Sequence, residues 1–107
     1  MKKAVWLSFD LGIKGDYEGL YQWLDACGAS ECGDNVAFFK HETKGNLPEE
    51  IKKSLENAVD TDSKTRIYIV YSKDKSVKGQ FLFGRRKSPT WAGYAPKETA
   101  DVSDEDK

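Results

Sequence analysis

The sequence predicts an α+β domain in which two helices cover one face of a mainly antiparallel sheet. Two segments carry apolar residues at helical spacing, and several others alternate or run apolar over the length of a strand. In chain order they are strand, helix, an uncertain short segment, strand, helix and two strands. Laying both helices on one sheet face is the simplest way to bury both apolar stripes. With a right-handed crossover for each helix, this order predicts a ferredoxin-like fold.

The first third of the chain predicts a strand followed by a helix. Residues 4–11 are largely apolar on both alternating faces, which is typical of a central strand. Asp16 is suited to cap a helix over about 16–27, because its carboxylate can accept from free backbone N–H groups. Gly28 is placed to end that helix in a left-handed turn, and Cys27 is expected on its apolar stripe.

The middle of the chain predicts a second strand and helix. Residues 30–33 are ambiguous between a short strand and a turn, whereas 35–42 contain four apolar residues in a row. After a loop at 43–46, Pro48 suits the first turn of a helix, where its missing N–H costs nothing. An apolar stripe made by Leu47, Ile51, Leu55, Ala58 and Val59 then follows at helical spacing.

The last part predicts a β-hairpin and a polar tail. Residues 66–72 alternate clearly and 80–84 form another strand, joined by a charged turn over 73–78 that is longer than the tightest hairpin turns. We expect a single domain over 1–97, followed by a disordered acidic tail over 98–107. The tail holds five acidic residues and one lysine, and the rest of the chain is therefore about +3 in formal charge, since the total is −1.

Composition and motifs exclude several classes of protein. The apolar run near the N-terminus stops at Asp10, which is too short for a signal peptide core or a membrane span. This predicts a cytoplasmic protein with no membrane partner. The two cysteines, Cys27 and Cys32, have neither a common zinc spacing nor a redox spacing, and we expect them to be reduced. His41 is the only histidine and is interpreted as a surface residue at a strand end, with a general base as the alternative.

Several short motifs resemble a known superfamily. The stretch Trp6-Leu-Ser-Phe-Asp10 ends a first strand in an aspartate, and an amphipathic helix that ends in glycine follows it. Gly33-Asp-Asn-Val-Ala-Phe-Phe39, a leucine-led helix and Arg66-Ile-Tyr68 come next. Over about residues 3–72 this pattern resembles the ferredoxin-like superfamily that contains the CRISPR adaptation subunit and virulence-associated protein D. The resemblance implies a homodimer of bacterial or phage type with metal-dependent nuclease activity, mostly on RNA.

Asp10 is the candidate catalytic and metal-binding residue. The resemblance places the superfamily's first-strand aspartate here, and a carboxylate at a strand end can hold Mg²⁺. Two such carboxylates across a dimer axis could position a metal-bound hydroxide for attack on a phosphodiester. The alternative is that Asp10 only accepts N–H groups from the loop between Gly12 and Gly15. The loop 11–15 and the chain beyond residue 72 depart from the family pattern.

A basic and aromatic segment is the strongest signal for nucleic acid. Lysine and arginine neutralise phosphates, and flat aromatic rings stack unpaired bases. The candidate nucleic-acid-binding residues lie on the last hairpin and after it: Lys78, Arg85, Arg86, Lys87, Trp91 and Tyr94. The alternative is a solvated sheet edge on which lysines prevent aggregation, with Trp91 folded back onto the core.

The other aromatic residues are interpreted first as core: Trp6, Trp23, Phe38, Phe39, Phe81 and Phe83. Part of the sheet face opposite the helices is nevertheless apolar, with Trp6, Tyr68 and Val70 as candidates. An uncovered apolar face usually has a partner, which supports a homodimer.

Two principal hypotheses of function stay open from the sequence. The first is a dimeric protein that interacts with RNA or DNA, with Asp10 and Mg²⁺ in a metal-dependent nuclease. The second is a non-catalytic binding or adaptor module that uses the sheet face and residues 84–94. A third hypothesis is an inhibitor whose acidic tail mimics nucleic acid.

Overall fold

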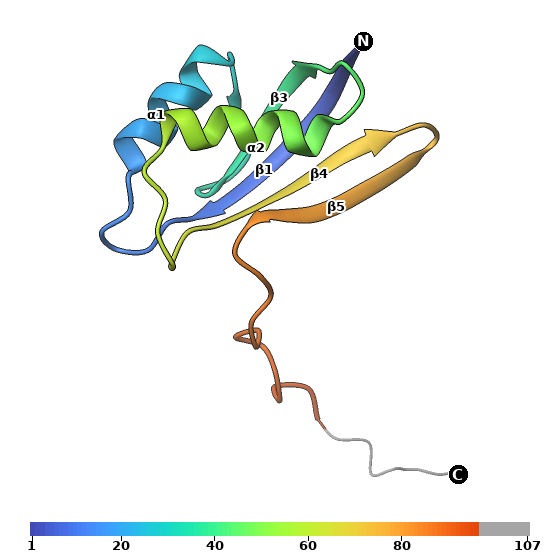
Figure 1. Cartoon of the computed structure of the whole chain (residues 1–107). Helices are drawn as coiled ribbons and strands as arrows, with labels where there is room; N and C mark the ends of the chain where they lie inside the picture. The colour runs from blue at the N-terminus through green and yellow to red at the C-terminus, as the bar shows by residue number, and fades with distance from the viewer. Residues whose placement is uncertain (97–107) are drawn as a thin grey trace.

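The computed structural model describes residues 1–96 and has the α+β architecture that the sequence predicts (Figure 1). The predicted tail over 98–107 lies outside the described residues. The described chain forms five strands and two helices: β1 (Lys2–Asp10), α1 (Tyr17–Ala26), β2 (Ser30–Glu31), β3 (Val36–Glu42), α2 (Leu47–Ala58), β4 (Arg66–Lys73) and β5 (Ser76–Phe83).

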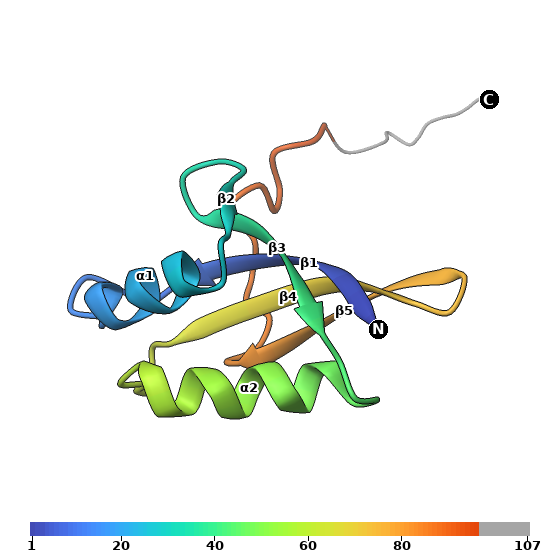
Figure 2. The same cartoon turned by 90° about the horizontal axis from the view of Figure 1, so that it is seen from above.

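The strands form one open sheet in the order β2-β3-β1-β4-β5, and every neighbouring pair is antiparallel (Figure 2). The first strand therefore lies in the middle, and its register brings Trp6 beside Phe38 of β3 and Val70 of β4. The prediction of a mainly antiparallel sheet is confirmed. The strand order is compatible with a ferredoxin-like arrangement to which β5 is added at one edge.

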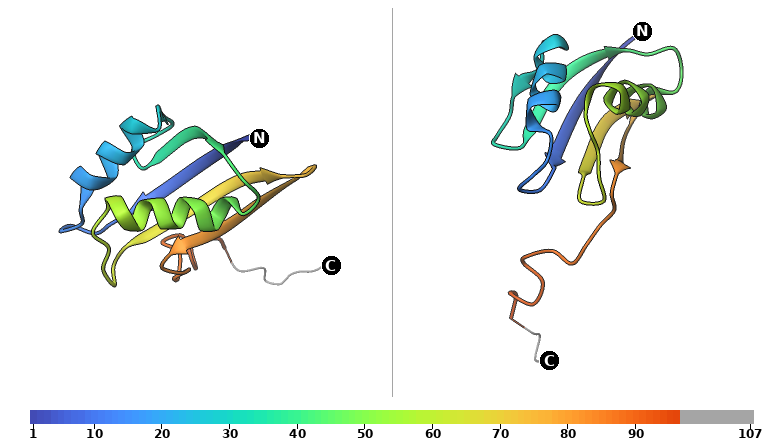
Figure 3. Two further views of the ribbon diagram at one scale, coloured as in Figure 1. Left: turned by 45° about the horizontal axis from the view of Figure 1, so that its top comes forward. Right: turned by 60° about the vertical axis from the view of Figure 1, so that its left-hand side comes forward.

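Both helices pack on the same face of the sheet (Figure 3). Along β1, Val5, Leu7 and Phe9 are buried while the residues between them are more exposed. This alternation follows from the twofold period of a strand. Leu20 and Leu24 of α1 meet this face in one buried cluster with the α2 residues Leu47, Ile51 and Leu55.

Asp16 holds the start of α1 to the end of α2. One carboxylate oxygen accepts from the Gly19 N–H at 2.9 Å, and the other accepts from the Asp60 N–H at 2.9 Å. These hydrogen bonds, first that from Asp60, lower the pKa of Asp16. A Cβ at Gly19 would lie 2.7 Å from the Ala58 carbonyl oxygen, so glycine lets α1 approach α2 closely. The predicted helix cap is confirmed.

A second polar contact anchors the start of α2. Asn46 caps the helix, and Pro48 lies in its first turn as predicted. His41 of β3 lies 2.8 Å from a carboxylate oxygen of Glu50, and the other carboxylate oxygen of Glu50 accepts from the Lys44 N–H at 3.0 Å. The bond from His41 is the main reason that the pKa of Glu50 falls to about 2.

Two local predictions were wrong, and the ambiguous segment is a short strand, β2. The hairpin turn is tight, because Lys73 pairs directly with Ser76 and only Asp74 and Lys75 lie between them. Asp74 adopts the left-handed conformation that such turns require, with φ of 56°. The charged residues over 73–78 had suggested a longer turn, but residues 76–78 already belong to β5, and an exposed edge strand can carry polar residues on both faces. Cys27 is exposed at the helix end and does not lie on the buried stripe.

Candidate nucleic-acid interface

The sheet face away from the helices has no described helix over it and is rich in aromatic side chains. We call it the open face and define it by the strand residues that alternate with the buried ones. They are Ala4, Trp6, Ser8 and Asp10 of β1, Val36, Phe38 and Lys40 of β3, Arg66, Tyr68, Val70 and Ser72 of β4, and Val77, Gly79 and Phe81 of β5.

Two aromatic pairs form the centre of the open face. The ring centroids of Trp6 and Phe38 lie 5.0 Å apart on neighbouring strands, and Trp6 is 41% exposed. The rings of Tyr68 and Phe81 meet edge to face with centroids 4.8 Å apart. The prediction that Trp6, Phe38 and Phe81 are core residues was therefore wrong. The helices cover only the other face, so Trp6 is exposed and Phe38 and Phe81 are only partly buried.

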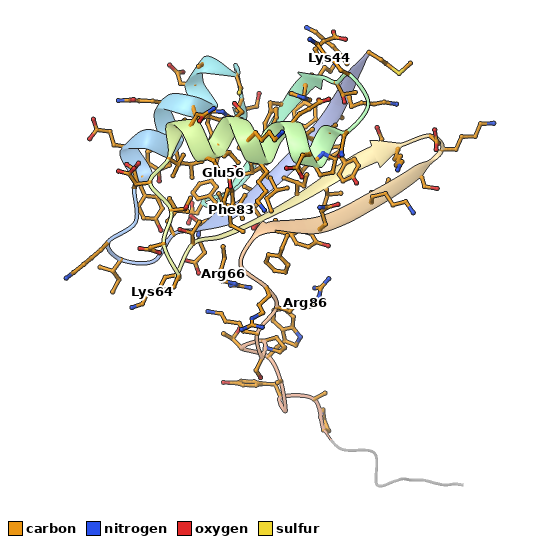
Figure 4. All side chains as sticks on the ribbon, viewed as in Figure 1. Lys44, Glu56, Lys64, Arg66, Phe83 and Arg86 are labelled. Atoms are coloured by element: carbon orange, nitrogen blue, oxygen red, sulfur yellow. The ribbon has the colours of Figure 1, made fainter. Side chains whose placement is uncertain are left out.

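Two arginines lie against the second aromatic pair. The Arg66 guanidinium carbon is 5.5 Å from the Phe81 ring centroid, and that of Arg86 is 5.7 Å from the Tyr68 centroid. The Arg66 Nε–H donates to the Arg85 carbonyl oxygen at 3.3 Å, which ties the segment after β5 to β4. Figure 4 shows Arg66 and Arg86 near the place where the chain leaves β5. A guanidinium cation is attracted to the face of an aromatic ring, so these contacts help to hold both the arginines and the rings in place.

A glycine makes room for the Tyr68 ring. A Cβ at Gly79 would lie 2.3 Å from the Tyr68 hydroxyl oxygen and 3.0 Å from the adjoining ring carbon. Gly79 therefore allows Tyr68 to lie down across β5 and meet Phe81. Gly79 pairs with Val70 and is therefore the diagonal neighbour of Tyr68 across the two strands. A side chain at position 79 would compete with the Tyr68 ring for the same space.

Asp10 lies at the edge of this cluster, in a pocket of about 280 Å³ that Ser8, Phe9, Asp10, Arg66, Tyr68, Phe81 and Arg86 line. Its carboxylate accepts from the Gly12 N–H at 3.1 Å and is 3.9 Å from an Arg66 nitrogen. The hydrogen bond from Gly12 is the contact expected from the alternative in which Asp10 only accepts N–H groups from the loop between Gly12 and Gly15. The side chain is still 53% exposed, so the carboxylate remains open to a ligand.

The surroundings of Asp10 do not by themselves make a metal site. Among residues 1–96, no group of three or more histidine, cysteine, aspartate and glutamate side chains could hold a metal ion. Asp10 is the one carboxylate among the residues that line the pocket, and two arginines line it as well. Mg²⁺ binds through oxygen ligands, and nearby guanidinium groups oppose its charge. A metal at Asp10 would need oxygen ligands from another molecule.

The structure brings only part of the predicted binding segment to the open face. Arg86 contacts the aromatic pair, and Arg85 contributes its carbonyl oxygen. Lys78 pairs with Tyr71, whose buried side chain faces the helices, so Lys78 belongs to the other side of β5. The sequence reasoning did not select Arg66, Phe38 or Phe81 as binding residues.

The described part of the segment after β5 runs away from the sheet (Figure 1). Lys87 is exposed, Trp91 is 73% exposed and Tyr94 is 83% exposed. The expectation that Trp91 folds back onto the core was therefore wrong. A short turn, in which the Ala92 N–H donates to the Pro89 carbonyl oxygen at 3.1 Å, presents Trp91 and Tyr94 to solvent.

A larger hollow, of about 700 Å³, lies on the other side of the sheet between the start of α2 and the β4–β5 hairpin. Its charged residues have both signs and include Lys3, Lys52, Lys73, Glu49 and Asp74. It contains neither of the two aromatic pairs, so we place the candidate site on the open face despite the smaller pocket there.

Comparison with known proteins adds no family. No protein-family model matches the chain, and no curated protein or solved structure matches it. The resemblance to the CRISPR adaptation subunit and virulence-associated protein D stays a prediction. None of the described helices is both long and apolar enough to cross a membrane.

Proposed function

We propose that the protein binds single-stranded nucleic acid on the open face. The observation that carries the proposal is the meeting of partly exposed aromatic pairs with arginines on the sheet face that no helix covers. Trp6 and Phe38 form one platform, and Tyr68 and Phe81 form another beneath Arg66 and Arg86. Aromatic rings stack unpaired bases, and cations beside them contact the phosphates between those bases.

The arrangement suits a single strand better than a duplex. Paired bases are already stacked on each other, so flat rings on a sheet reach only bases that are splayed out of a helix. Sheets that present aromatic side chains are a recurrent surface for single-stranded RNA. The exposed Lys87, Trp91 and Tyr94 on the segment after β5 extend the same chemistry beyond the sheet.

The charge of the open face favours nucleic acid over a second copy of the chain. Lys40 lies toward one end of β1, beside Ala4, and Arg66 and Arg86 lie at the other end, near Asp10. Asp10 is the one carboxylate among these residues, so the face has a net positive charge and two stacked copies of it would repel each other. A polyanion meets both ends favourably. The homodimer remains an alternative occupant that a measurement of mass in solution tests.

We also propose the finer fold assignment, a ferredoxin-like domain in the cytoplasm. The order β2-β3-β1-β4-β5 with two crossover helices supports the fold. A nuclease that uses Asp10 and Mg²⁺ is the second candidate, favoured by the half-exposed carboxylate at the edge of the aromatic pocket. Binding without cleavage ranks first, because Asp10 faces Arg66 and has no neighbouring carboxylate in that pocket.

The test compares labelled single-stranded and double-stranded RNA and DNA, each with Mg²⁺, Mn²⁺ or EDTA. We expect single strands to bind in all three conditions, with weaker binding at higher salt and no cleavage. Asp10→Asn should then bind about as well as the wild type. Cleavage that requires both metal and Asp10 would instead establish the nuclease, and the absence of any binding would overturn both candidates.

A further inference from the structure

The basic end of the open face is also the end from which the chain leaves the sheet. Arg85 and Arg86 directly follow β5 and Gly84, and they are held at the open face through Arg66 and Tyr68. The acidic segment 98–107 begins only 12 positions after Arg86 and carries a formal charge of about −4. A cluster of arginines and a strongly acidic segment are thus tethered to each other.

We propose that the acidic segment, residues 98–107, occupies the open face when nucleic acid is absent and is displaced when nucleic acid binds. The inference rests on the proposed function, because it makes the segment a competitor for the same cations. Its carboxylates would lie against Arg66 and Arg86 in place of phosphates. The partner of this surface in the free protein is therefore a segment of the same chain.

The chain between Arg86 and residue 98 is long enough to reach the open face and short enough to keep the acidic segment close to it. An extended chain spans at most about 3.3–3.6 Å per residue, so 12 residues reach roughly 40 Å. That distance allows the segment to turn back over the sheet. A linker of this length can set an effective concentration of the order of millimolar. A contact too weak to form between separate molecules can therefore be populated within one chain.

The composition of the segment explains why nucleic acid would displace it. Its acidic residues are Glu98, Asp101, Asp104, Glu105 and Asp106, and it contains no aromatic residue. It can neutralise the arginines but cannot stack on Trp6 or Tyr68, whereas a nucleic acid does both. The segment would weaken non-specific electrostatic binding more than binding in which bases stack.

The first experiment uses the full-length chain with the charge of the segment removed by five substitutions: Glu98→Gln, Asp101→Asn, Asp104→Asn, Glu105→Gln and Asp106→Asn. A matched variant loses five exposed acids from the helix layer and the turn after it: Glu18→Gln, Asp25→Asn, Glu49→Gln, Glu56→Gln and Asp60→Asn. Both variants gain the same net charge, so a difference between them reports position and not total charge.

We expect the first variant to bind a labelled oligouridine about three- to tenfold more tightly than the wild type at low salt, and clearly more tightly than the matched variant. The difference should shrink as salt is added, because screening weakens contacts between exposed charges. Equal affinities of the two variants would mean that only total charge acts, and this result would overturn the inference while leaving nucleic-acid binding intact.

A second measurement keeps the inference testable if the protein binds no oligonucleotide. A peptide of residues 97–107 is added to the full-length variant that carries the five amide substitutions, and the Trp6 indole and the Arg66 and Arg86 side chains are followed by NMR. We expect shifts at these three residues that are absent with a peptide in which the five acids are amides. No shifts, or shifts located on the helices, would overturn the inference.

Discussion

The two faces of the sheet are built from the same strands but have different chemistry. On β1, Leu7 is fully buried beneath the helices, whereas its neighbour Trp6 points to the other side and is 41% exposed. The covered face is mainly aliphatic and is closed by α1 and α2. The open face carries aromatic rings and arginines and has no covering helix.

Along each strand, residues that stabilise the fold alternate with residues that are available to bind a ligand. Aliphatic side chains on the covered face lose water on folding, and this burial is the main favourable contribution to stability. Rings on the open face keep part of their surface in water, which leaves apolar area and stacking geometry for a ligand. We therefore expect substitutions on the covered face to unfold the protein and substitutions on the open face to change binding.

The largest expected effect is on the covered face. Leu7→Ala should lower the free energy of unfolding by about 2–5 kcal/mol, because it leaves a cavity between the sheet and the helices. Trp6→Ala, one position away, should lower it by only about 1 kcal/mol. Urea unfolding followed by circular dichroism measures both. Equal losses would mean that Trp6 is part of the folding core and that the two faces do not differ as described.

The open face should show the reverse effect. Trp6→Ala and Tyr68→Ala should each weaken binding to single strands, since one lost stacking contact costs about 1–3 kcal/mol. That range corresponds to a loss of affinity of roughly five- to 150-fold. Tyr21→Ala is the matched control, because Tyr21 is an exposed aromatic residue on α1. A comparable loss of affinity in the control would place the binding surface on the helix layer.

The arginines should act through salt dependence. Arg66→Gln and Arg86→Gln should each reduce the slope of log affinity against log salt by about 1, as expected when one phosphate contact is lost. Lys53→Gln, on the exposed side of α2, should leave the slope unchanged. An unchanged slope in both arginine variants would remove them from the binding site.

The smallest effect concerns pH and stability on the helix side. The folded pKa of Glu50 is about 2, below its ordinary value of 4.5, chiefly because of the bond from His41. A lowered carboxyl pKa stabilises the fold above the unfolded pKa, and this contribution is lost as pH falls from about 4.5 toward 2. Glu50→Gln should therefore make the protein less stable at pH 6 and flatten the pH dependence below 4.5.

That prediction is checked by thermal melting of both proteins between pH 2 and pH 7. Binding measured at pH 7 should be unaffected by Glu50→Gln, since Glu50 contacts His41 and the loop before α2 and not the open face. If the two proteins show parallel pH profiles, the pair of His41 and Glu50 contributes nothing to folding.

Much of the fold was predictable because periodicity and capping are local properties. The apolar spacing of Leu20, Leu24, Ile51 and Leu55 located both helices, and Asp16 marked where α1 begins. The hairpin turn was misplaced because residues 76–78 are exposed residues of an edge strand, and the charged and polar residues over 73–78 look like a loop. Local patterns carry no information about which strand lies at the edge.

The candidate site was less predictable because it depends on which face stays uncovered. Asp10 was selected from the superfamily resemblance and its place at a strand end, and Arg86 from its charge, but Arg66 and Phe38 come to the site only through strand pairing. A β-bulge between β4 and β5 lets Phe81 lie on the open face while Phe83 packs against the core on the helix side. Strict alternation would have placed both rings on one face.

The most direct test of the account is an NMR titration of the labelled protein with a single-stranded oligonucleotide. The account predicts shifts at the Trp6 indole and at the ring signals of Phe38, Tyr68 and Phe81, with little change at Ile51 and Leu55 of α2. Shifts confined to the helix layer, or no shifts at concentrations at which the oligonucleotide is in excess, would contradict recognition by the open face.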